Sequence, residues 1–219
     1  MIDIVYIVHP GDENQELRYS LRSLENLPHG DVWMFGGPAW VKNVRRVDFE
    51  DRGKWASLTS AMRIAAERLE RFVLFNDDFY VMTPMPEVPV LHTGRLGANM
   101  RRHGGSQYMT GRRNAYGFLL AHGVADPLNY EVHAPMTFYG PALDDCFAEM
   151  GSFDPQGYVR SVYGNLIGIG GRRCDDFKYG LTPGAPPALP FLSTDATSWR
   201  HGYVGDVVRA TFRAPSEYE

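Results

Sequence analysis

The chain has few cysteines and no long hydrophobic run, and both shortages exclude whole classes of protein. Its 219 residues contain only two cysteines, Cys146 and Cys174, without the spacing of a zinc site or the number that a disulfide framework needs. No stretch approaches the about 18 apolar residues of a membrane-spanning helix. The opening MIDIVYIVHPGDENQ lacks the basic and long apolar regions of a signal peptide. We therefore expect no membrane span and a cytoplasmic location, in the host cytoplasm if a phage encodes the chain.

An excess of positive charge is also missing. The formal net charge is −4, so the composition gives no overall signature of a nucleic-acid-binding protein. Arginine pairs at 101–102, 112–113 and 172–173 are local candidates for a basic patch, although solvated surface arginines are the simpler interpretation. The sequence has no Gly-x-Ser-x-Gly and no phosphate-loop lysine, and the glycines at 168–171 do not match a dinucleotide fingerprint.

What the first half does contain is an alternation of short apolar runs and amphipathic stretches. The runs at 2–8, 32–35, 44–49 and 71–75 predict strands, because short β-branched segments without alternation are typical of strands buried on both faces. The stretches at 14–27 and 55–69 predict helices, the first capped by Asp12 or Asn14. This order indicates a single α/β domain with a mainly parallel, mixed sheet flanked by helices.

The second half is less regular. Three prolines make 84–90 a loop or edge, and helices are predicted at 116–122, 141–150 and 204–212. Residues 130–133 predict a short strand, and 166–171 fits either a strand or a helix. No repeat or linker divides the chain.

The most informative local feature is an acidic pair that stops a buried strand. Asp77 and Asp78 follow the apolar run 72–75 and Asn76. Strand ends of this kind lie at the carboxyl edge of the sheet, where open α/β folds bind ligands. Carboxylates there need a cation, a basic partner or water. A hard divalent ion that bridges to a diphosphate would meet that need; a solvent-exposed Asn-Asp-Asp turn is the alternative.

Several blocks of the sequence resemble the Stealth family of sugar-phosphate transferases from bacterial capsules. The blocks are Asp3-Ile-Val-Tyr6, Glu16-Leu-Arg-Tyr-Ser-Leu-Arg-Ser-Leu24, Phe72-Val-Leu-Phe-Asn-Asp-Asp-Phe79 and Glu131-Val-His-Ala-Pro135. The short length and the carboxyl-terminal segment also look like small glycosyltransferase-like proteins of phages and bacteria. The resemblance implies a GT-A-like nucleotide-sugar transferase fold.

The resemblance also implies roles for individual residues. Asp77 and Asp78 would bind the metal and the diphosphate, and His133 would act at the phosphate or as an acid/base group. His133 and Asp78 are therefore the expected catalytic residues. Arg18 and Arg22 lie one helical turn apart, so both can face one ligand such as a phosphate.

Three further residues are candidates for contacts with the donor. Lys54 lies just before the second predicted helix, where its ammonium can reach a phosphate at the helix start. Arg200 and His201 lie in a segment that can fold back over a diphosphate, and Asn76 belongs to the acidic turn itself. Asp176 and Lys178 can line the cleft, but an ion pair on the surface is the simpler interpretation.

The function predicted from the sequence is that of a metal-dependent glycosyltransferase that uses a nucleotide-diphosphate sugar donor with Mn²⁺ or Mg²⁺. Residues 1–83 would form the nucleotide-binding half, and residues 84–219 the acceptor half and carboxyl-terminal closure. Transfer of a sugar-1-phosphate and a non-catalytic carbohydrate-binding module of the same fold are the alternatives. The acceptor stays open among a glycan, a protein and, for a phage protein, modified DNA contacted through the arginine pairs. The oligomeric state stays open as well.

Overall fold

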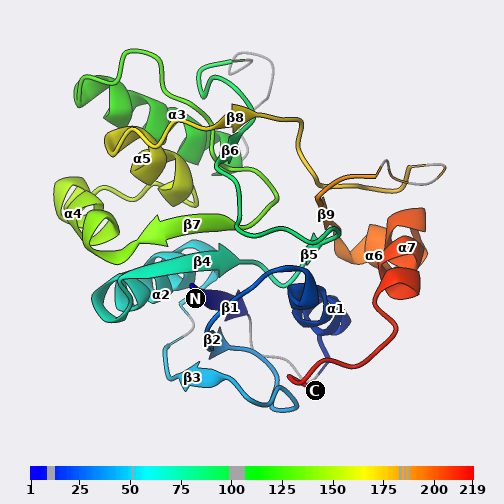
Figure 1. The fold of residues 1–219 in the computed structure, drawn as a ribbon. Coiled ribbons are helices and arrows are strands. Elements are labelled where there is room, and N and C mark those ends of the chain that lie inside the picture. The colour runs from blue at the N-terminus through cyan, green and yellow to red at the C-terminus, as the bar shows by residue number, and fades with distance from the viewer. Residues whose placement is uncertain (9–12, 51, 99–106, 183, 185, 187) are drawn as a thin grey trace.

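A five-stranded sheet in the order β3-β2-β1-β4-β7 organises the chain (Figure 1). The computed structural model describes residues 1–219 except 9–12, 51, 99–106, 183, 185 and 187. The first four strands in chain order are parallel, and the last is antiparallel to its neighbour β4. The strands are β1 (Asp3–Val8), β2 (Val32–Gly36), β3 (Arg45–Val47), β4 (Arg71–Phe75) and β7 (Met136–Tyr139).

Helices pack on both faces of this sheet, as alternating side chains of the central strands require. Val5 and Leu74 belong to one apolar cluster, which α2 (Lys54–Arg68) and α4 (Gly140–Met150) cover. Ile4 and Tyr6 belong to the opposite cluster, which α1 (Gln15–Ser23) and the short 3₁₀-helix η1 (Leu24–Asn26) cover. The predicted class, a single α/β domain with a mainly parallel sheet flanked by helices, is therefore confirmed.

The first helix forms where the sequence predicts it. Asn14 caps α1, because its side-chain oxygen accepts a hydrogen bond from the backbone N–H of Leu17 at 2.9 Å. The predicted apolar stripe is buried against the sheet: Leu17, Leu21, Leu24 and Leu27.

Two small sheets bring distant parts of the chain to the carboxyl end of β4. The strand β5 (Phe79–Val81) pairs antiparallel with β9 (Phe191–Ser193), and β6 (Leu91–His92) pairs parallel with β8 (Arg172–Arg173). The remaining helices are α3 (Gln107–Ala121), α5 (Val159–Leu166), α6 (Ala196–His201) and α7 (Tyr203–Thr211). The β5–β9 pairing matters most for the site, because it places residues 193–196 beside the acidic turn at 76–78.

The structure corrects several predictions for the second half. Residues 130–133 form no strand, and the strand lies instead at β7. The helix predicted at 116–122 begins at Gln107, and residues 167–171 form neither strand nor helix. The elements α5, α6 and β9 were not predicted. The loop at 129–135 does not need strand pairing because side chains satisfy its backbone: Ser161 Oγ accepts from the N–H of Tyr130, and Arg160 donates to two of its carbonyls.

No helix in the described part of the chain is long and apolar enough to cross a membrane.

Candidate functional site

The strand order reverses between β1 and β4. The chain leaves β1 through α1 towards β2 on one side, and returns through α2 to β4 on the other. In open α/β sheets the crevice at such a reversal, outside the carboxyl ends of the strands, is where ligands bind. A cavity of about 470 Å³ lies there, which we call the outer cavity. Its lining includes the end of β1, the turn after β4 and the start of α2: Ile7, Val8, Glu16, Phe49, Lys54, Trp55, Ser57, Leu58, Asn76, Asp77, Asp78, His133, Lys178, Thr194, Asp195 and Ala196.

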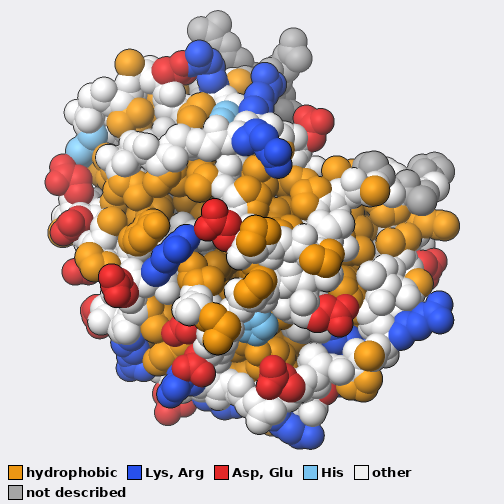
Figure 2. Space-filling view, viewed as in Figure 1, with side chains coloured by type: hydrophobic (Ala, Val, Ile, Leu, Met, Phe, Trp, Pro, Cys, Tyr) orange, Lys and Arg blue, Asp and Glu red, His pale blue; other side chains and the backbone are white. Residues whose placement is uncertain are grey.

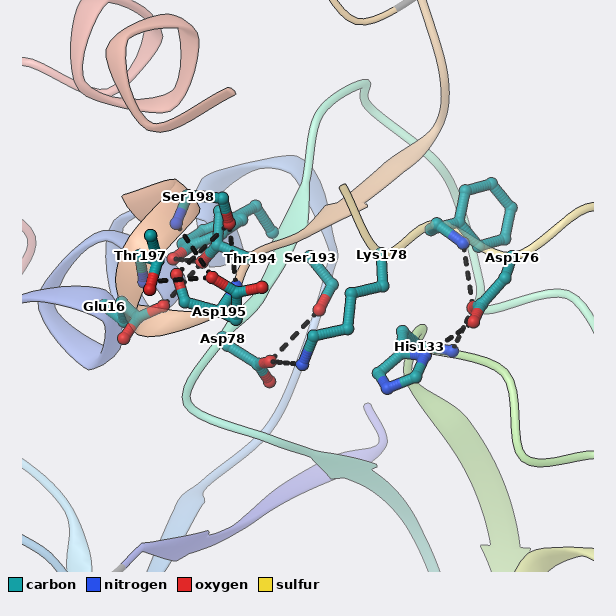
Figure 3. A network of polar contacts seen from close by, with 12 residues as sticks. Glu16, Asp78, His133, Asp176, Lys178, Ser193, Thr194, Asp195, Thr197 and Ser198 are labelled. Carbon is teal, nitrogen blue, oxygen red and sulfur yellow. Dashed lines mark hydrogen bonds and ion pairs between the residues drawn. The ribbon is translucent and has the colours of Figure 1, made fainter. Parts of the chain in front are cut away.

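The two adjacent aspartates are held by different parts of the fold. Asp77 accepts a hydrogen bond from the Asn14 side chain at 2.6 Å, so the residue that caps α1 also fixes this carboxylate. Asp78 accepts from Ser193 Oγ at 3.1 Å and from Lys178 Nζ at 3.3 Å (Figure 3). The acidic turn is therefore tied to α1, to β9 and to the segment before it, and is not a free surface turn.

A third carboxylate, that of Glu16, belongs to the same cavity. It lies in the first turn of α1 and accepts a hydrogen bond from Thr194 Oγ1 at 2.6 Å (Figure 3). Burial raises the pKa of Glu16, the hydrogen bond from Thr194 lowers it, and the charges of Asp78 and Asp77 raise it. Three carboxylates therefore share one electrostatic field, which favours binding of a cation.

Two lysines also line this cavity. Lys178 forms the ion pair with Asp78, and Lys54 is the first residue of α2, with its Nζ 4.7 Å from the centre of the Trp55 ring. The start of α2 also carries the positive end of a 15-residue helix. An anion bound at Lys54 and the start of α2 would therefore meet positive potential.

His133 is held in one orientation by Asp176. Its ring Nδ1 lies 2.7 Å from Asp176 Oδ2, and its backbone N–H donates to Oδ1 at 2.8 Å (Figure 3). Burial raises the pKa of Asp176, but the hydrogen bonds from His133 outweigh burial and lower it below its usual value. Because an ionised carboxylate only accepts, Nδ1 carries the proton, which leaves Nε2 as the nitrogen that can exchange a proton with a ligand.

A second, smaller cavity of about 140 Å³ adjoins the first, and we call it the inner cavity. The two share Lys54, Trp55, Leu58, Asn76 and His133 as lining residues. The rest of the inner lining is Phe79, Tyr108, Glu131, Val132, Gly157 and Arg160.

Besides Lys54, two charged side chains line the inner cavity: Glu131 and Arg160. Burial raises the pKa of Glu131 to about 7, and its Oε1 accepts from the backbone N–H of Ser161 at 2.9 Å. Arg160 is 8% exposed and donates to the carbonyls of Val132 and Ala134 at 3.0 and 2.7 Å. The buried guanidinium therefore fixes the backbone on both sides of His133.

Of the residues that the sequence predicts, the structure brings together Lys54, Asn76, Asp77, Asp78 and His133. The other four do not line either cavity. Arg18 and Arg22 both face one carboxylate, as their spacing predicts, but it is the side chain of Glu219. Arg200 and His201 end α6, and the start of that segment lines the outer cavity in their place.

Sequence reasoning missed Glu16, Glu131 and Arg160 and treated Asp176 and Lys178 as surface residues. Glu16 could have been identified from the sequence, because it is the first residue of the Glu16–Leu24 block that resembles the Stealth family. Asp176 and Lys178 could not be identified in this way, because their partners are distant in the sequence. His133 and Asp176 are 43 positions apart, and Asp78 and Lys178 are 100 positions apart.

The donor atoms at the acidic turn are suited to a hard divalent cation. Asn76, Asp77 and Asp78 offer only oxygen ligands, as Mg²⁺ and Mn²⁺ prefer. Among the residues that the structure describes, no group of three or more His, Cys, Asp or Glu side chains is close enough to hold a metal ion. One or two carboxylates suffice where substrate phosphates complete the coordination, so the residues fit a metal that arrives with a diphosphate.

The arginine pairs are only partly described. Residues 101–102 lie outside the described residues, and Arg112 donates to the carbonyls of Leu96 and Ala98. On the face drawn in Figure 2, basic and acidic side chains are interspersed, apart from a small basic group near β6 and β8. The exposed Arg172 and Arg173 form β8.

The sequence matches no known protein family. No curated protein matches it either. Among solved structures it is similar to the apo form of mouse xyloside xylosyltransferase 1, with 11% identity over 100% of this chain and 96% of the other and a TM-score of 0.39. A sequence identity and a TM-score this low support no inference about function, so the resemblance to the Stealth family stays a prediction.

Proposed function

We propose that this protein is a metal-dependent glycosyltransferase whose outer cavity binds a nucleotide-diphosphate sugar together with Mg²⁺ or Mn²⁺. The observation that carries the proposal is the outer cavity itself. It lies at the strand-order reversal, and its lining combines Asp77 and Asp78 with Lys54 at a helix start. This pattern suits a diphosphate and its cation, because each finds opposite charge within one cleft.

In this account Asp77 and Asp78, with the Asn76 amide, would hold the cation that accompanies the diphosphate. When bound, the cation would neutralise the negative charge that develops on the departing nucleoside diphosphate. Lys54 and the backbone N–H groups at the start of α2 bind phosphate oxygens. Lys178 keeps the Asp78 carboxylate in place through its ion pair.

His133 is the acid/base group of the proposed transfer. Its Nε2 takes the proton of the acceptor hydroxyl while the acceptor oxygen bonds to the anomeric carbon. The bond from that carbon to the diphosphate breaks, and its electron pair leaves on the diphosphate. Asp176 is a positioning residue, since it acts through the imidazole and stabilises the charge that forms there.

Transfer of a sugar-1-phosphate is the second candidate, favoured by the sequence blocks at Glu16–Leu24 and Phe72–Phe79. The two reactions differ in their nucleotide product. Release of a nucleoside diphosphate supports glycosyl transfer, and release of a nucleoside monophosphate supports sugar-phosphate transfer. In both cases residues 1–83 would supply Lys54, Asp77 and Asp78 to the donor, and residues 84–219 would supply His133 and meet the acceptor.

The experiment that tests the proposal is thermal unfolding against a panel of nucleoside diphosphates and nucleotide sugars with Mn²⁺, Mg²⁺ or EDTA. A ligand at about a hundred times its dissociation constant adds about 2.7 kcal/mol of stability. We expect a shift that needs metal and that Asp78→Asn abolishes. The exposed Asp144→Asn on α4 is the matched control and should keep the shift. If no nucleotide shifts the transition, the proposal is wrong, and a non-catalytic module of the same architecture becomes the better account.

A further inference from the structure

The inner cavity has a composition typical of a ligand site, and the proposed transfer uses only part of it. Its volume of about 140 Å³ corresponds to about four or five water molecules at about 30 Å³ each. It therefore suits one ring-sized group and not a chain of several rings. Three aromatic side chains, Trp55, Phe79 and Tyr108, form apolar walls around a small number of polar groups, the combination typical of small-molecule sites.

The position of the inner cavity relates it to the donor. Asn76 lines both cavities and directly precedes the two aspartates. A group attached to a diphosphate that is held at Asp77 and Asp78 would therefore lie at the entrance to the inner cavity. His133 also lines both cavities, so the reacting carbon would lie beside the proposed acid/base group.

We propose that the inner cavity binds the glycosyl group of the donor as a single neutral sugar ring, with the Glu131 carboxylate accepting a hydrogen bond from one of its hydroxyls. This inference rests on the proposed function and names the part of the site that selects the sugar. One Glu131 oxygen is used by the Ser161 N–H. The charge of Arg160 and the hydrogen bonds from Ser161 stabilise the carboxylate, whose two oxygens can accept about four hydrogen bonds, so acceptor capacity is left for a ligand.

The chemistry of the lining also predicts which sugars are excluded. A uronic acid would bring a second carboxylate into the cavity that Glu131 lines, and like charges at short range are unfavourable. The positive charge of Arg160 is already matched by the Glu131 carboxylate, which it stabilises. Lys54 also lines the cavity, but the proposed function assigns it to the diphosphate, so a second carboxylate would lack a cationic partner. Neutral hexoses and pentoses are therefore the expected class.

The competing interpretation gives Glu131 only a structural role. The Ser161 N–H that it binds lies in the first turn of α5, so the carboxylate also satisfies a helix end. Glu131→Gln keeps an oxygen for that contact and removes the charge, and so separates the two roles. Tyr108→Ala is a second variant that removes one cavity wall; Tyr108 is 42% exposed, so the fold should tolerate the change.

The experiment is calorimetric titration of UDP and GDP, and of UDP-glucose, UDP-galactose, UDP-N-acetylglucosamine, UDP-glucuronate and GDP-mannose, each with Mn²⁺. At least one neutral sugar conjugate should bind about tenfold or more tightly than its own nucleoside diphosphate, the gain expected from one hydrogen bond to a charged group. UDP-glucuronate should show no such gain. Glu131→Gln and Tyr108→Ala should each lose most of the gain and keep the affinity for the bare nucleoside diphosphate.

Two results would overturn the inference and leave the proposed function intact. One is equal affinity for the conjugates and the bare nucleoside diphosphates. The other is that a folded Glu131→Gln or Tyr108→Ala variant still binds the sugar conjugate more tightly than its nucleoside diphosphate. The same conclusion holds if such a variant keeps this gain in affinity and instead raises the KM for an acceptor. Absence of any nucleoside diphosphate binding would overturn the inference together with the proposed function.

Discussion

His133 and Asp176 are 43 positions apart in the chain, yet the Asp176 carboxylate accepts hydrogen bonds from both the ring and the backbone of His133. The ring cannot turn without breaking the 2.7 Å contact at Nδ1. Figure 3 shows this pair beside the group formed by Asp78, Lys178 and Ser193. A proton-accepting nitrogen is thus held in the cleft that contains the acidic turn, which is the arrangement that the proposed transfer requires.

Asp176→Asn should lower turnover by about tenfold or more and leave nucleotide binding unchanged. General acid/base groups contribute about 10²- to 10⁴-fold, and a misoriented imidazole loses part of that. The loss should appear in kcat and not in the KM for the nucleotide sugar, because Asp176 contacts only the imidazole and the loop backbone. The neighbouring exposed Asp175→Asn is the control. An unchanged kcat would mean that Asp176 only supports the loop.

The pH dependence of stability provides a test of the environment of Glu131. Its folded pKa of about 7 lies above the ordinary value of 4.5, so the unfolded chain releases this proton first as the pH rises. The contribution of Glu131 to stability is therefore fully present below about pH 4.5 and is lost between about pH 4.5 and 7, by up to about 3 kcal/mol. Arg160, His133, Tyr108 and Lys54 also face this cavity and are unchanged in a Glu131 variant.

Glu131→Gln removes that titration. The stability of the variant relative to the parent chain should therefore rise between pH 5 and pH 8, measured by urea unfolding. The absolute difference also includes the loss of charge near the buried Arg160, so the trend with pH is the quantity to compare. A difference that does not change with pH would show that Glu131 is not held in a desolvated position.

Arg22→Ala should destabilise the fold by about 1.5–3 kcal/mol, the range for hydrogen bonds to charged groups. Arg22 donates to Glu219 and to the carbonyl of Phe212, and so fastens the last residues to α1. Arg45→Ala is the matched control, because its ion pair with Asp31 is exposed and should contribute about 0–1 kcal/mol.

The same pair has a defined pH window. Burial raises the pKa of Glu219, but the hydrogen bond from Arg22 and the other contacts outweigh burial and lower the pKa to about 2. The stabilisation is therefore present above about pH 4.5 and is lost as the pH falls towards 2. Urea unfolding at pH 7 and pH 3 should show the cost of Arg22→Ala shrinking at the lower pH. A cost that stays constant would point to lost packing and not to the ion pair.

The first half of the fold is readable from the sequence because its signals are local. The apolar run that ends at Phe75 and the Asn14 cap each depend on neighbours within a few residues. Residues 130–133 are different: their β-branched and aromatic character predicts a strand, but Arg160 and Asp176 bind the backbone of this loop from distant elements. Tertiary hydrogen bonds replaced the ladder that local propensity predicts.

The candidate site divides in the same way. Asp77 and Asp78 are visible in the sequence because charges that interrupt an apolar run need an explanation. Glu131 and Lys178 are ordinary charged residues until the fold buries the first and pairs the second with Asp78. Arg18 and Arg22 show the reverse case: their shared face is predictable from helical spacing, but the carboxylate that they bind lies about 200 positions away.

The central claim, that the outer cavity binds a nucleoside diphosphate through a cation at Asp77 and Asp78, is tested most directly by calorimetric titration of nucleoside diphosphates. The titration compares the parent chain and Asp78→Asn, each with Mn²⁺ and with EDTA. The account predicts binding by the parent chain with Mn²⁺, and at least about tenfold weaker binding with EDTA or in the variant. Binding that is equally tight in all four conditions, or absent in all four, would contradict it.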